Sequence, residues 1–513
     1  MTPTPLADPD AVDRLGADLR AAGYDAEHVP TLLGPGANHA LGRGHRWPAL
    51  HVTGRAAAEG SALATLVRLF LLGTAEPEGA VVAALPRLGV AAGLAGGVLE
   101  RTSGDGDGEP GRIRAGLDIR PHADDDRSYL VVSDLDSDVR PGPVRPDHVL
   151  GIGAASVTLA RAVIRAPVGR VLDLGTGCGI QALHCASHAD AVTATDTNPR
   201  ALALAAATAR LNGQHWDLRG GSLFEPVAGE RFDLIVSNPP FVISAGEQRF
   251  SYRDSGMAGD ELCRRLVAEL PDHLTPGGTA QLLANWMIPA GTDWRQRVGS
   301  WIAGTGCDGW VVQREVADPA EYVSLWLSDT GESVAADAEQ LAGEWLDYLA
   351  AEGVAGIGMG SITLRRPPSR AGAVPDVVFD ELTAAGDELT GAEVAAFLAR
   401  RAWLADRGDD DLLSTRLSLA PGDLLERRAL PGANGWRTVL RLLHRPGGPG
   451  ASVQLDEWGQ ALLGGCTGAV PLGVQVQLLA AAHQLDPAAL AAAVLPAVRT
   501  AITRGLLHPV DAP

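Results

Sequence analysis

The stretch Asp173-Leu174-Gly175-Thr176-Gly177-Cys178-Gly179 is the strongest indication of fold class in this chain. It lies where a short apolar strand, expected over residues 171–174, ends and a helix, expected from residue 180, begins. Glycines at such a junction let the backbone turn tightly and approach a ligand without a Cβ clash. The spacing is GxGxG and differs from the GxGxxG of nicotinamide-binding turns. Alone, the stretch is compatible with a ligand-binding turn, a dinucleotide cradle or a plain turn.

The next expected strand, residues 191–195, ends in a carboxylate. Asp196 stands in Thr195-Asp196-Thr197-Asn198-Pro199, just before a helix expected over residues 198–211. A carboxylate at this place can accept hydrogen bonds from both hydroxyls of a ribose. The alternative is an N-cap for the helix that follows. Because the glycine-rich turn comes one strand earlier, we favour the ribose contact.

The third motif, Asn238-Pro239-Pro240-Phe241, directly follows a strand expected over residues 232–236. Two prolines fix the backbone in a rigid, extended turn. The Asn238 carboxamide oxygen and the Pro239 carbonyl oxygen can then accept both hydrogens of a substrate NH2 group, which aims its lone pair at an electrophile. Phe241 offers a flat face to a planar amide or base. A chance Pro-Pro turn is the alternative, but three motifs in order on successive strands favour a site acting on nitrogen.

With these motifs, residues 141–367 resemble class I S-adenosylmethionine-dependent methyltransferases. Within that class the resemblance is to the amino-methyltransferases of the release-factor glutamine methyltransferase group, whose relatives methylate exocyclic amines of adenine or guanine. It implies a Rossmann-like fold, S-adenosyl-L-methionine as cofactor and methyl transfer to nitrogen. The residues that it implies at the cofactor are Asp173 (facing the amine), Gly175, Thr176, Gly177, Gly179, Asp196 (on the ribose), Leu223 (beside the adenine) and Asn238. The implied catalytic residues are Asn238, Pro239, Pro240 and Phe241.

Some positions depart from that group. Its members commonly have Asp, an aromatic residue and Tyr where this chain has Ser222, Leu223 and Phe241. Their short helical N-terminal domain does not match residues 1–140, and residues 368–513 have no counterpart. These differences leave the cofactor assignment unchanged. They concern the identity of the group that accepts the methyl.

For the acceptor we favour a protein glutamine side-chain amide, such as that of a peptide chain release factor. The resemblance supports it, as do the net charge of -20 and the lack of a long arginine-rich run. An exocyclic base amine in rRNA, tRNA or DNA is the alternative, because Phe241 can stack on a base. A non-catalytic binding protein built on the cofactor fold, and a nicotinamide oxidoreductase, are the competing classes. The complete set of glycines, with Asp196 and Asn238, argues against the non-catalytic class.

Composition excludes several enzyme classes. All 42 basic side chains are arginine, so no lysine is available for a phosphate-binding loop, a Schiff base or pyridoxal phosphate. The five cysteines form no CxxC pair, which is typical of reduced thiols in a cytoplasmic protein. Residues 1–10 carry acids where a signal peptide has bases, and no stretch has the pattern of a membrane span. No set of side chains has metal-ligand spacing, so we expect no metal.

The chain is expected to have three regions. Residues 1–140 combine helices over 10–22, 61–72 and 78–84 with strands over 113–119 and 128–132, which suggests a winged-helix-like domain for substrate recognition. Pro141, Pro143 and Pro146 mark a linker. Residues 141–367 alternate strand and helix, with late strands over 279–284 and 357–364, and predict an α/β, doubly wound, mostly parallel sheet. Residues 368–513 form an accessory domain, with helices beginning near Thr390 and Asp486.

Two segments beside the motifs carry weaker indications. Residues 147–151 precede the α/β region where related enzymes often close over the cofactor, and a lid and a structured linker are both open. Arg253-Asp254-Ser255-Gly256 follows the catalytic turn and can contact substrate, although we favour a surface loop.

Overall fold

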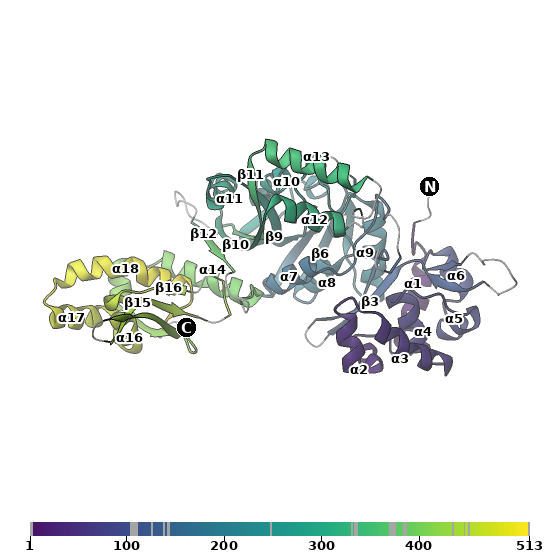
Figure 1. The fold of residues 1–513 in the computed structure, drawn as a ribbon, viewed down its shortest axis with the longest axis horizontal. Coiled ribbons are helices and arrows are strands. Elements are labelled where there is room, and N and C mark those ends of the chain that lie inside the picture. Colours follow the sequence, from purple (N-terminus) through teal and green to yellow (C-terminus); the bar gives the residue numbers. More distant parts are fainter. Residues whose placement is uncertain are drawn as a thin grey trace. The chain divides into compact units, whose positions relative to one another are not determined.

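The computed structural model describes residues 4–102, 111–124, 127–136, 139–140, 144–246, 249–329, 332, 337–368, 376–382, 387–432, 435–445, 447–449 and 452–510. The chain forms two compact units (Figure 1). The first is Met1–Ala160, Ala166–Val311 and Glu315–Phe379, and the second is Arg161–Arg165, Val312–Arg314 and Asp380–Pro513. Of the linker prolines, Pro141 and Pro143 lie outside the described residues. None of the helices among the described residues is long and apolar enough to cross a bilayer.

An eight-stranded sheet is the centre of the α/β region, with the strand order β12-β10-β11-β9-β8-β5-β6-β7. The pairs β5–β6, β6–β7, β5–β8 and β8–β9 are parallel, and β9–β11 is antiparallel. This confirms the predicted doubly wound, mostly parallel sheet. The strands are β5 (Val168–Leu174), β6 (Ala189–Asp196), β7 (Asp217–Gly220), β8 (Phe232–Ser237), β9 (Leu274–Pro289), β10 (Asp308–Ala317), β11 (Val354–Arg365) and β12 (Val377–Glu381).

Helices cover the sheet through separate hydrophobic clusters. One cluster joins α10 and α11 to β5, β8 and β9, and it includes Leu266, Trp294 and Ile235. Another joins α12 and α13 to β9 and β11, and it includes Tyr322 and Leu349. The helices of this region are α7 (Ala154–Ala162), α8 (Ile180–Cys185), α9 (Pro199–Leu211), α10 (Glu261–Glu269), α11 (Trp294–Ile302), α12 (Pro319–Asp329) and α13 (Ala338–Ala351).

The N-terminal region is helical with two hairpins. Ser61 caps α4, because its side chain accepts a hydrogen bond from the Ala64 amide. The strand predicted over residues 113–119 is two strands, β2 paired with β1 and β3 paired with β4. The break falls at Gly116, where a Cβ would lie 2.3 Å from the Gly97 carbonyl oxygen. The elements are α1 (Pro9–Ala21), α2 (His28–Leu41), α3 (Trp47–Ala58), α4 (Ala62–Leu66), a π-helix (Val67–Leu71), α5 (Glu78–Ala84), α6 (Val90–Ala95), β1 (Leu99–Arg101), β2 (Ile113–Ala115), β3 (Asp118–Asp124) and β4 (Arg127–Ser133).

The N-terminal region shares its core with the α/β region. One cluster contains Leu15 and Leu19 of α1 together with Leu183 of α8 and Leu204 of α9. The Asn212 side chain, at the end of α9, accepts from the Leu130 amide at 2.9 Å and donates to the Leu130 carbonyl at 2.7 Å. The boundary expected near residue 140 therefore falls inside one compact unit.

The second unit has its own core, built around Leu417, Leu472 and Ile502. Thr390 caps α14, whose first turn also contains Glu393; the Glu393 carboxylate binds Arg400 and Arg445. Helix α18 continues through Pro496. The elements are α14 (Gly391–Ala405), α15 (Asp409–Ser414), β13 (Arg416–Leu419), β14 (Leu424–Gly432), β15 (Gly435–His444), β16 (Ser452–Gln454), α16 (Glu457–Gly465), β17 (Thr467–Pro471), α17 (Leu472–His483), α18 (Pro487–Thr503) and β18 (Leu507–Pro509).

Candidate functional site

The predicted site residues follow the carboxyl ends of four neighbouring parallel strands. Leu174 at the end of β5 pairs with Thr195 of β6 and with Ser237 of β8, and Asp196 pairs with Gly220 of β7. The chain leaves β5 toward β6 on one side and reaches β8 on the other, so the strand order reverses at β5. Ligands of open α/β sheets bind in the crevice at such a reversal.

The glycine-rich turn between β5 and α8 needs glycine for two reasons. Gly175, Gly177 and Gly179 have φ of 78°, 55° and 85°, a left-handed conformation that side chains disfavour. A Cβ on Gly175 or Gly177 would meet no atom within 4 Å, so the backbone there borders open space. A Cβ on Gly179 would lie 2.6 Å from the Trp216 ring. Gly179 thus packs against Trp216, while the first two glycines border room for a ligand.

Asp173 is a buried carboxylate beneath this turn. Its Oδ2 accepts from the Thr176 hydroxyl at 2.6 Å and from the Ala182 amide at 2.9 Å. Its Oδ1 is buried and has no hydrogen-bond partner among the described residues. Burial raises the pKa of Asp173 to about 6, against the lowering effect of these hydrogen bonds. A buried acceptor without a partner suits a cationic group such as the amine of a cofactor.

Asp196 fastens the same turn to β6. Its Oδ2 accepts from the Gly177 amide at 2.9 Å and its Oδ1 from the Asn198 amide at 2.8 Å. The N-cap of α9 is Asn198, so the helix-capping role that was the alternative for Asp196 belongs to Asn198. Each carboxylate oxygen keeps a second lone pair, which can accept a ribose hydroxyl. Burial raises the pKa of Asp196 and the backbone amides oppose that rise.

Leu223, in the segment that follows β7, has a strained backbone conformation. The Gly221 amide donates to the Asp196 carbonyl at 3.1 Å, which places the segment after β7 beside the end of β6. Leu223 has φ of 49°, which is rare for a residue with a branched side chain. Its side chain packs on the cluster of β5 and β8, whereas Ser222 is exposed. Such strain concentrates at functional sites.

The Asn238-Phe241 turn follows β8 on the other side of β5. The Ser237 hydroxyl donates to the Leu174 carbonyl at 2.8 Å and ties the two strand ends together. The Asn238 Nδ2 atom donates to the Ser156 hydroxyl at 3.3 Å, and its Oδ1 is buried without a partner among the described residues. One end of the carboxamide is thereby held while the accepting end remains available.

Three family models match the chain. The model described as a methyltransferase small domain matches residues 151–301. Models described as domains of unknown function match residues 21–109 and 395–509. A putative protein N5-glutamine methyltransferase of Methanocaldococcus jannaschii is 34% identical over 134 residues, which are 25% of this chain and 68% of the relative. This chain belongs to the S-adenosylmethionine-dependent methyltransferases.

Other relatives of this methyltransferase are matched over smaller shares. A release factor glutamine methyltransferase of Xylella fastidiosa is 43% identical over 129 residues, 23% of this chain and 47% of the relative. A ribosomal RNA small subunit methyltransferase C of Alcanivorax borkumensis is 34% identical over 121 residues, 24% of this chain and 34% of the relative. The chain therefore spans between about a third and two thirds of the relatives' own lengths.

The residues at the strand ends fit S-adenosylmethionine, the cofactor of this family. Gly175 and Gly177 leave space along the backbone, the buried Oδ1 of Asp173 can take the amine, and Asp196 can take the ribose hydroxyls. Among the described residues, no group of three His, Cys, Asp or Glu side chains could hold a metal ion. All five cysteines are buried free thiols.

The chain that follows Phe241 in the methyltransferase is fastened to α12 and α13. The Ile243 amide donates to the Tyr322 hydroxyl at 3.0 Å, and the Trp345 indole donates to the Ile243 carbonyl at 2.8 Å. The Phe241 ring meets the Trp326 ring edge-on, with centroids 6.1 Å apart. These contacts fix the direction in which the Asn238–Phe241 turn leaves the sheet.

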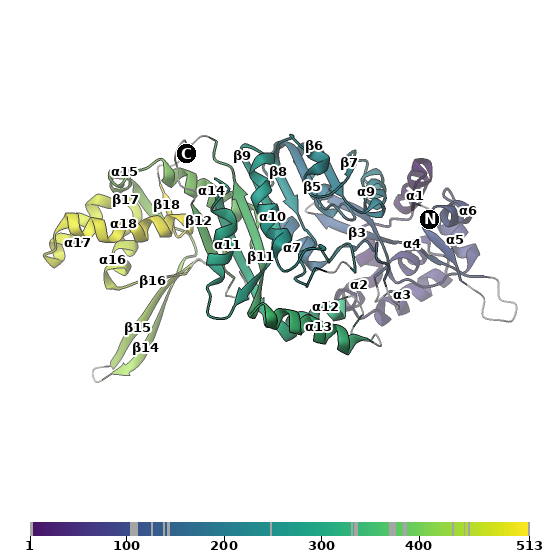
Figure 2. The same cartoon turned by 90° about the horizontal axis from the view of Figure 1, so that it is seen from above.

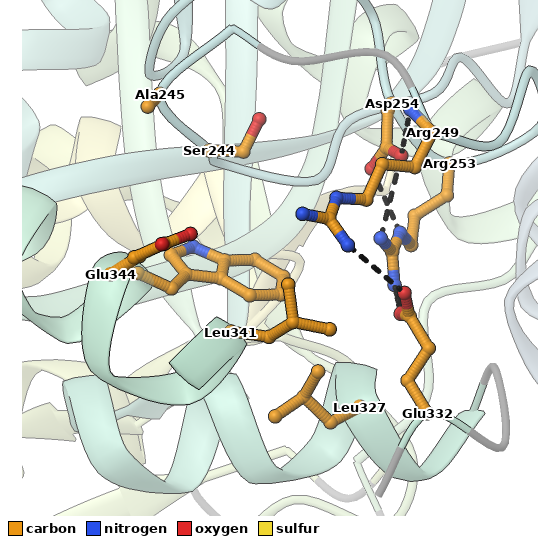
Figure 3. A pocket seen from close by; sticks show the side chains of 10 residues that line it. Ser244, Ala245, Arg249, Arg253, Asp254, Leu327, Glu332, Leu341 and Glu344 are labelled. Atoms are coloured by element: carbon orange, nitrogen blue, oxygen red, sulfur yellow. Dashed lines mark hydrogen bonds and ion pairs between the residues drawn. The ribbon is translucent and has the colours of Figure 1, made fainter. Parts of the chain in front are cut away.

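A hollow beside this segment contains the Arg253-Asp254 pair (Figure 3). Arg253 is only 4% exposed; it binds Asp254 Oδ1 at 2.8 Å and Glu332 Oε2 at 3.2 Å. Its guanidinium lies 5.0 Å from the centre of the Phe250 ring and 5.6 Å from that of Trp345. The expected surface loop was therefore wrong for these two residues, because the ion pair and both rings bury them.

Sequence reasoning did not find Ser156, Ser237 or Tyr322. Ser156 lies 82 residues before Asn238, and a lone serine in an apolar helix carries no signal. The segment at residues 147–151 was left open between a lid and a linker. The Val149 amide donates to Asp134 Oδ2 at 3.0 Å and the Val149 carbonyl accepts from the Asp134 amide, so β4 holds this segment in place.

Proposed function

We propose that this methyltransferase acts on a planar nitrogen, the side-chain amide of a protein glutamine in a component of the translation machinery such as a peptide chain release factor. The observation that carries the proposal is the buried Oδ1 of Asn238 at the carboxyl end of β8, which has no hydrogen-bond partner among the described residues. Relatives named release factor, ribosomal protein uL3 and protein N5-glutamine methyltransferases support the glutamine.

Each residue then has a role set by its contacts. S-adenosylmethionine, when bound, supplies an electrophilic methyl group. The Asn238 Oδ1 and the Pro239 carbonyl accept the two hydrogens of the acceptor amide and stabilise the positive charge that develops on its nitrogen. Pro240 keeps the turn rigid, and Phe241 lies against the plane of the amide. Positioning does most of the work, so no metal or strong base is required.

A base amine of RNA is the second candidate. The observation in its favour is the similarity to a ribosomal RNA small subunit methyltransferase C.

In either case we propose that residues 1–140 contribute to substrate recognition, that the C-terminal unit is an accessory domain, and that the protein works in the cytoplasm.

The test separates the two acceptors. The purified chain is incubated with cell extract and methyl-labelled cofactor, and the product is divided between protease and nuclease. We expect the label to survive nuclease and to be lost to protease, with methylglutamine after digestion. Label that survives protease and is released by nuclease would overturn the glutamine proposal, and no label in any fraction would favour a non-catalytic scaffold.

The Asn238→Ala variant tests the mechanism in the same assay. It removes one acceptor of the amide hydrogens, so we expect transfer to fall at least about a hundredfold. Cofactor affinity should stay within a few-fold, because the glycine turn and Asp196 are untouched. The matched control is Asn38→Ala on the exposed face of α2, which should retain full transfer. Full transfer by Asn238→Ala would contradict the assigned role.

A further inference from the structure

Strands β14 and β15 of the C-terminal unit form a two-stranded antiparallel arm, residues 424–432 and 435–444 (Figure 2). Nearly every residue of β14 is exposed, and burial on β15 is confined to the base of the arm at Leu443. β16 pairs with β15 only over Leu442–His444, so the outer part of the arm has no third strand. Its side chains are therefore not explained by packing within the unit.

The arm is basic in a chain whose net charge is -20. It carries Arg427, Arg428, Arg437 and Arg441, and its one acid, Glu426, is paired with Arg428 at 2.8 Å. Arg441 binds Glu457, whereas Arg427 and Arg437 have no hydrogen bond or ion pair within the described part of the chain. Arg427 stands directly opposite Arg441 across the two strands. Like charges in that arrangement destabilise a hairpin, and a bound polyanion would offset the repulsion.

Apolar and aromatic side chains lie among these arginines. Trp436 is 77% exposed, Leu430 is 54% exposed and Val439 is 47% exposed. Trp436 faces Pro431 across the strands, and the next pair inward is Leu430 with Arg437. An exposed indole beside unpaired guanidinium groups is the combination with which proteins hold unpaired nucleotides. The ring stacks on a base and the cations follow the backbone phosphates.

We propose that the β14–β15 arm binds a single-stranded segment of RNA. Trp436 stacks on an unpaired base and Arg427, on the same face of the arm, contacts a phosphate, while Arg437 contacts a phosphate from the opposite face. An acidic protein surface would match the arginines but would leave the indole exposed, so it fits the arm less well. The choice of RNA over DNA rests on the proposed function, whose acceptor belongs to the translation machinery. The arm belongs to the second unit, and the residues assigned to methyl transfer belong to the first.

Fluorescence anisotropy of the full chain with a labelled unpaired 12-nucleotide RNA tests the proposal. We expect Trp436→Ala to weaken RNA binding about tenfold. The double variant Arg427→Gln with Arg437→Gln should weaken binding at least about tenfold. It should also make the slope of log affinity against log salt concentration shallower, by the amount that corresponds to the loss of about two phosphate contacts. The matched controls are Trp458→Ala, a less exposed indole on α16, and Arg416→Gln on β13, which should bind RNA like the parent. Equal binding by parent and arm variants would overturn the proposal.

Further arms of the experiment separate the competing partners. Tighter binding to duplex RNA, to single-stranded DNA, to heparin or to poly-glutamate than to the unpaired RNA would overturn the assignment. So would retention of the parent, but not of the arm variants, on anionic phosphatidylserine vesicles. Cofactor binding and methyl transfer are measured on the same variants. If the chain does not bind RNA but still transfers methyl to glutamine, only the arm assignment is wrong. If it binds RNA through the arm but does not methylate glutamine, the arm assignment stands and the proposed acceptor is wrong.

Discussion

The Asp173 carboxylate carries a structural cost, which we propose is linked to a role in cofactor binding. In an unfolded chain this carboxyl ionises near pH 3.8, whereas in the folded protein burial raises its pKa to about 6. Between these values the folded protein holds a proton that the unfolded chain has lost, so this group makes stability fall as pH rises through that window. A cationic cofactor group at Oδ1 would lower the folded pKa and recover part of that cost.

The Asp173→Asn variant should therefore be more stable and bind the cofactor less well. Asparagine can still accept from the Ala182 amide and it carries no buried charge. We expect its melting temperature to exceed that of the parent by roughly a few degrees at pH 7.5, with the difference shrinking toward pH 4.5. Titration calorimetry should show at least about tenfold weaker cofactor binding. A variant less stable than the parent at pH 7.5, or unchanged affinity, would contradict this account.

Asp196 is predicted to bind the cofactor ribose in addition to holding the Gly177 and Asn198 amides. Replacing it with alanine removes two charge-assisted hydrogen bonds to ribose hydroxyls, each worth about 1.5–3 kcal/mol. We expect the Kd for S-adenosylmethionine to rise by at least about tenfold. Asp217→Ala on the exposed start of β7 is the matched control and should bind like the parent. If the two variants bind equally well in calorimetry, the ribose assignment is wrong.

Arg253 connects the residue scale to the elements around the site. It neutralises Asp254, which accepts from the Arg249 and Phe250 amides, and it binds Glu332. Arg253→Met would leave the buried Asp254 and the half-buried Glu332 without this cation, a cost of about 3–5 kcal/mol. We expect the melting temperature to fall by several degrees. We expect kcat to fall as well, because the segment after Phe241 loosens, while the cofactor Kd stays unchanged.

The control for Arg253 is its neighbour. Arg249 approaches the same Glu332 at 3.8 Å and is more exposed, so Arg249→Met should change the melting temperature much less. Thermal unfolding followed by circular dichroism, with steady-state kinetics, distinguishes the two. Equal effects of both substitutions would mean that the buried ion pair does not hold the segment.

Elements with a strong local pattern were predictable from sequence, and elements fixed by distant contacts were not. β5, β6 and β8 are short apolar strands. Gly175 follows β5, Asp196 ends β6 and Asn238-Pro239 follows β8, which explains why these strand ends and the three motifs were found. β7 was missed because its four residues are partly exposed and polar. Arg253 was misjudged because its partner Glu332 and the ring of Trp345 come from residues far along the chain. Nothing local distinguishes a buried charge of this kind from a loop residue.

At the scale of the molecule, the N-terminal region and the methyltransferase sheet share one hydrophobic core and should fold together. α9 presents Leu204 and Leu211 to α1, and α8 presents Ile180 and Leu183 to the same cluster. A boundary drawn from sequence near residue 140 cuts through this cluster. Composition and turn residues mark where a chain bends, but they do not show whether the two sides bury a common surface. Family models that match residues 21–109 and 151–301 separately do not settle that question either.

A fragment of residues 141–367 should therefore fail to fold on its own. It would expose Ile180, Leu183, Leu204 and Leu211, each of which loses about 1.5–3 kcal/mol of burial energy. Together these losses approach the total stability of a typical domain, about 5–15 kcal/mol. It would also lose the hydrogen bonds that Asn212 and Thr208 make to β4. We expect this fragment to bind a hydrophobic dye and to show no cooperative melting, whereas residues 1–379 melt in one transition and bind the cofactor with the affinity of the full chain. A fragment of residues 141–367 that melts cooperatively and binds the cofactor equally well would show that the shared core is dispensable.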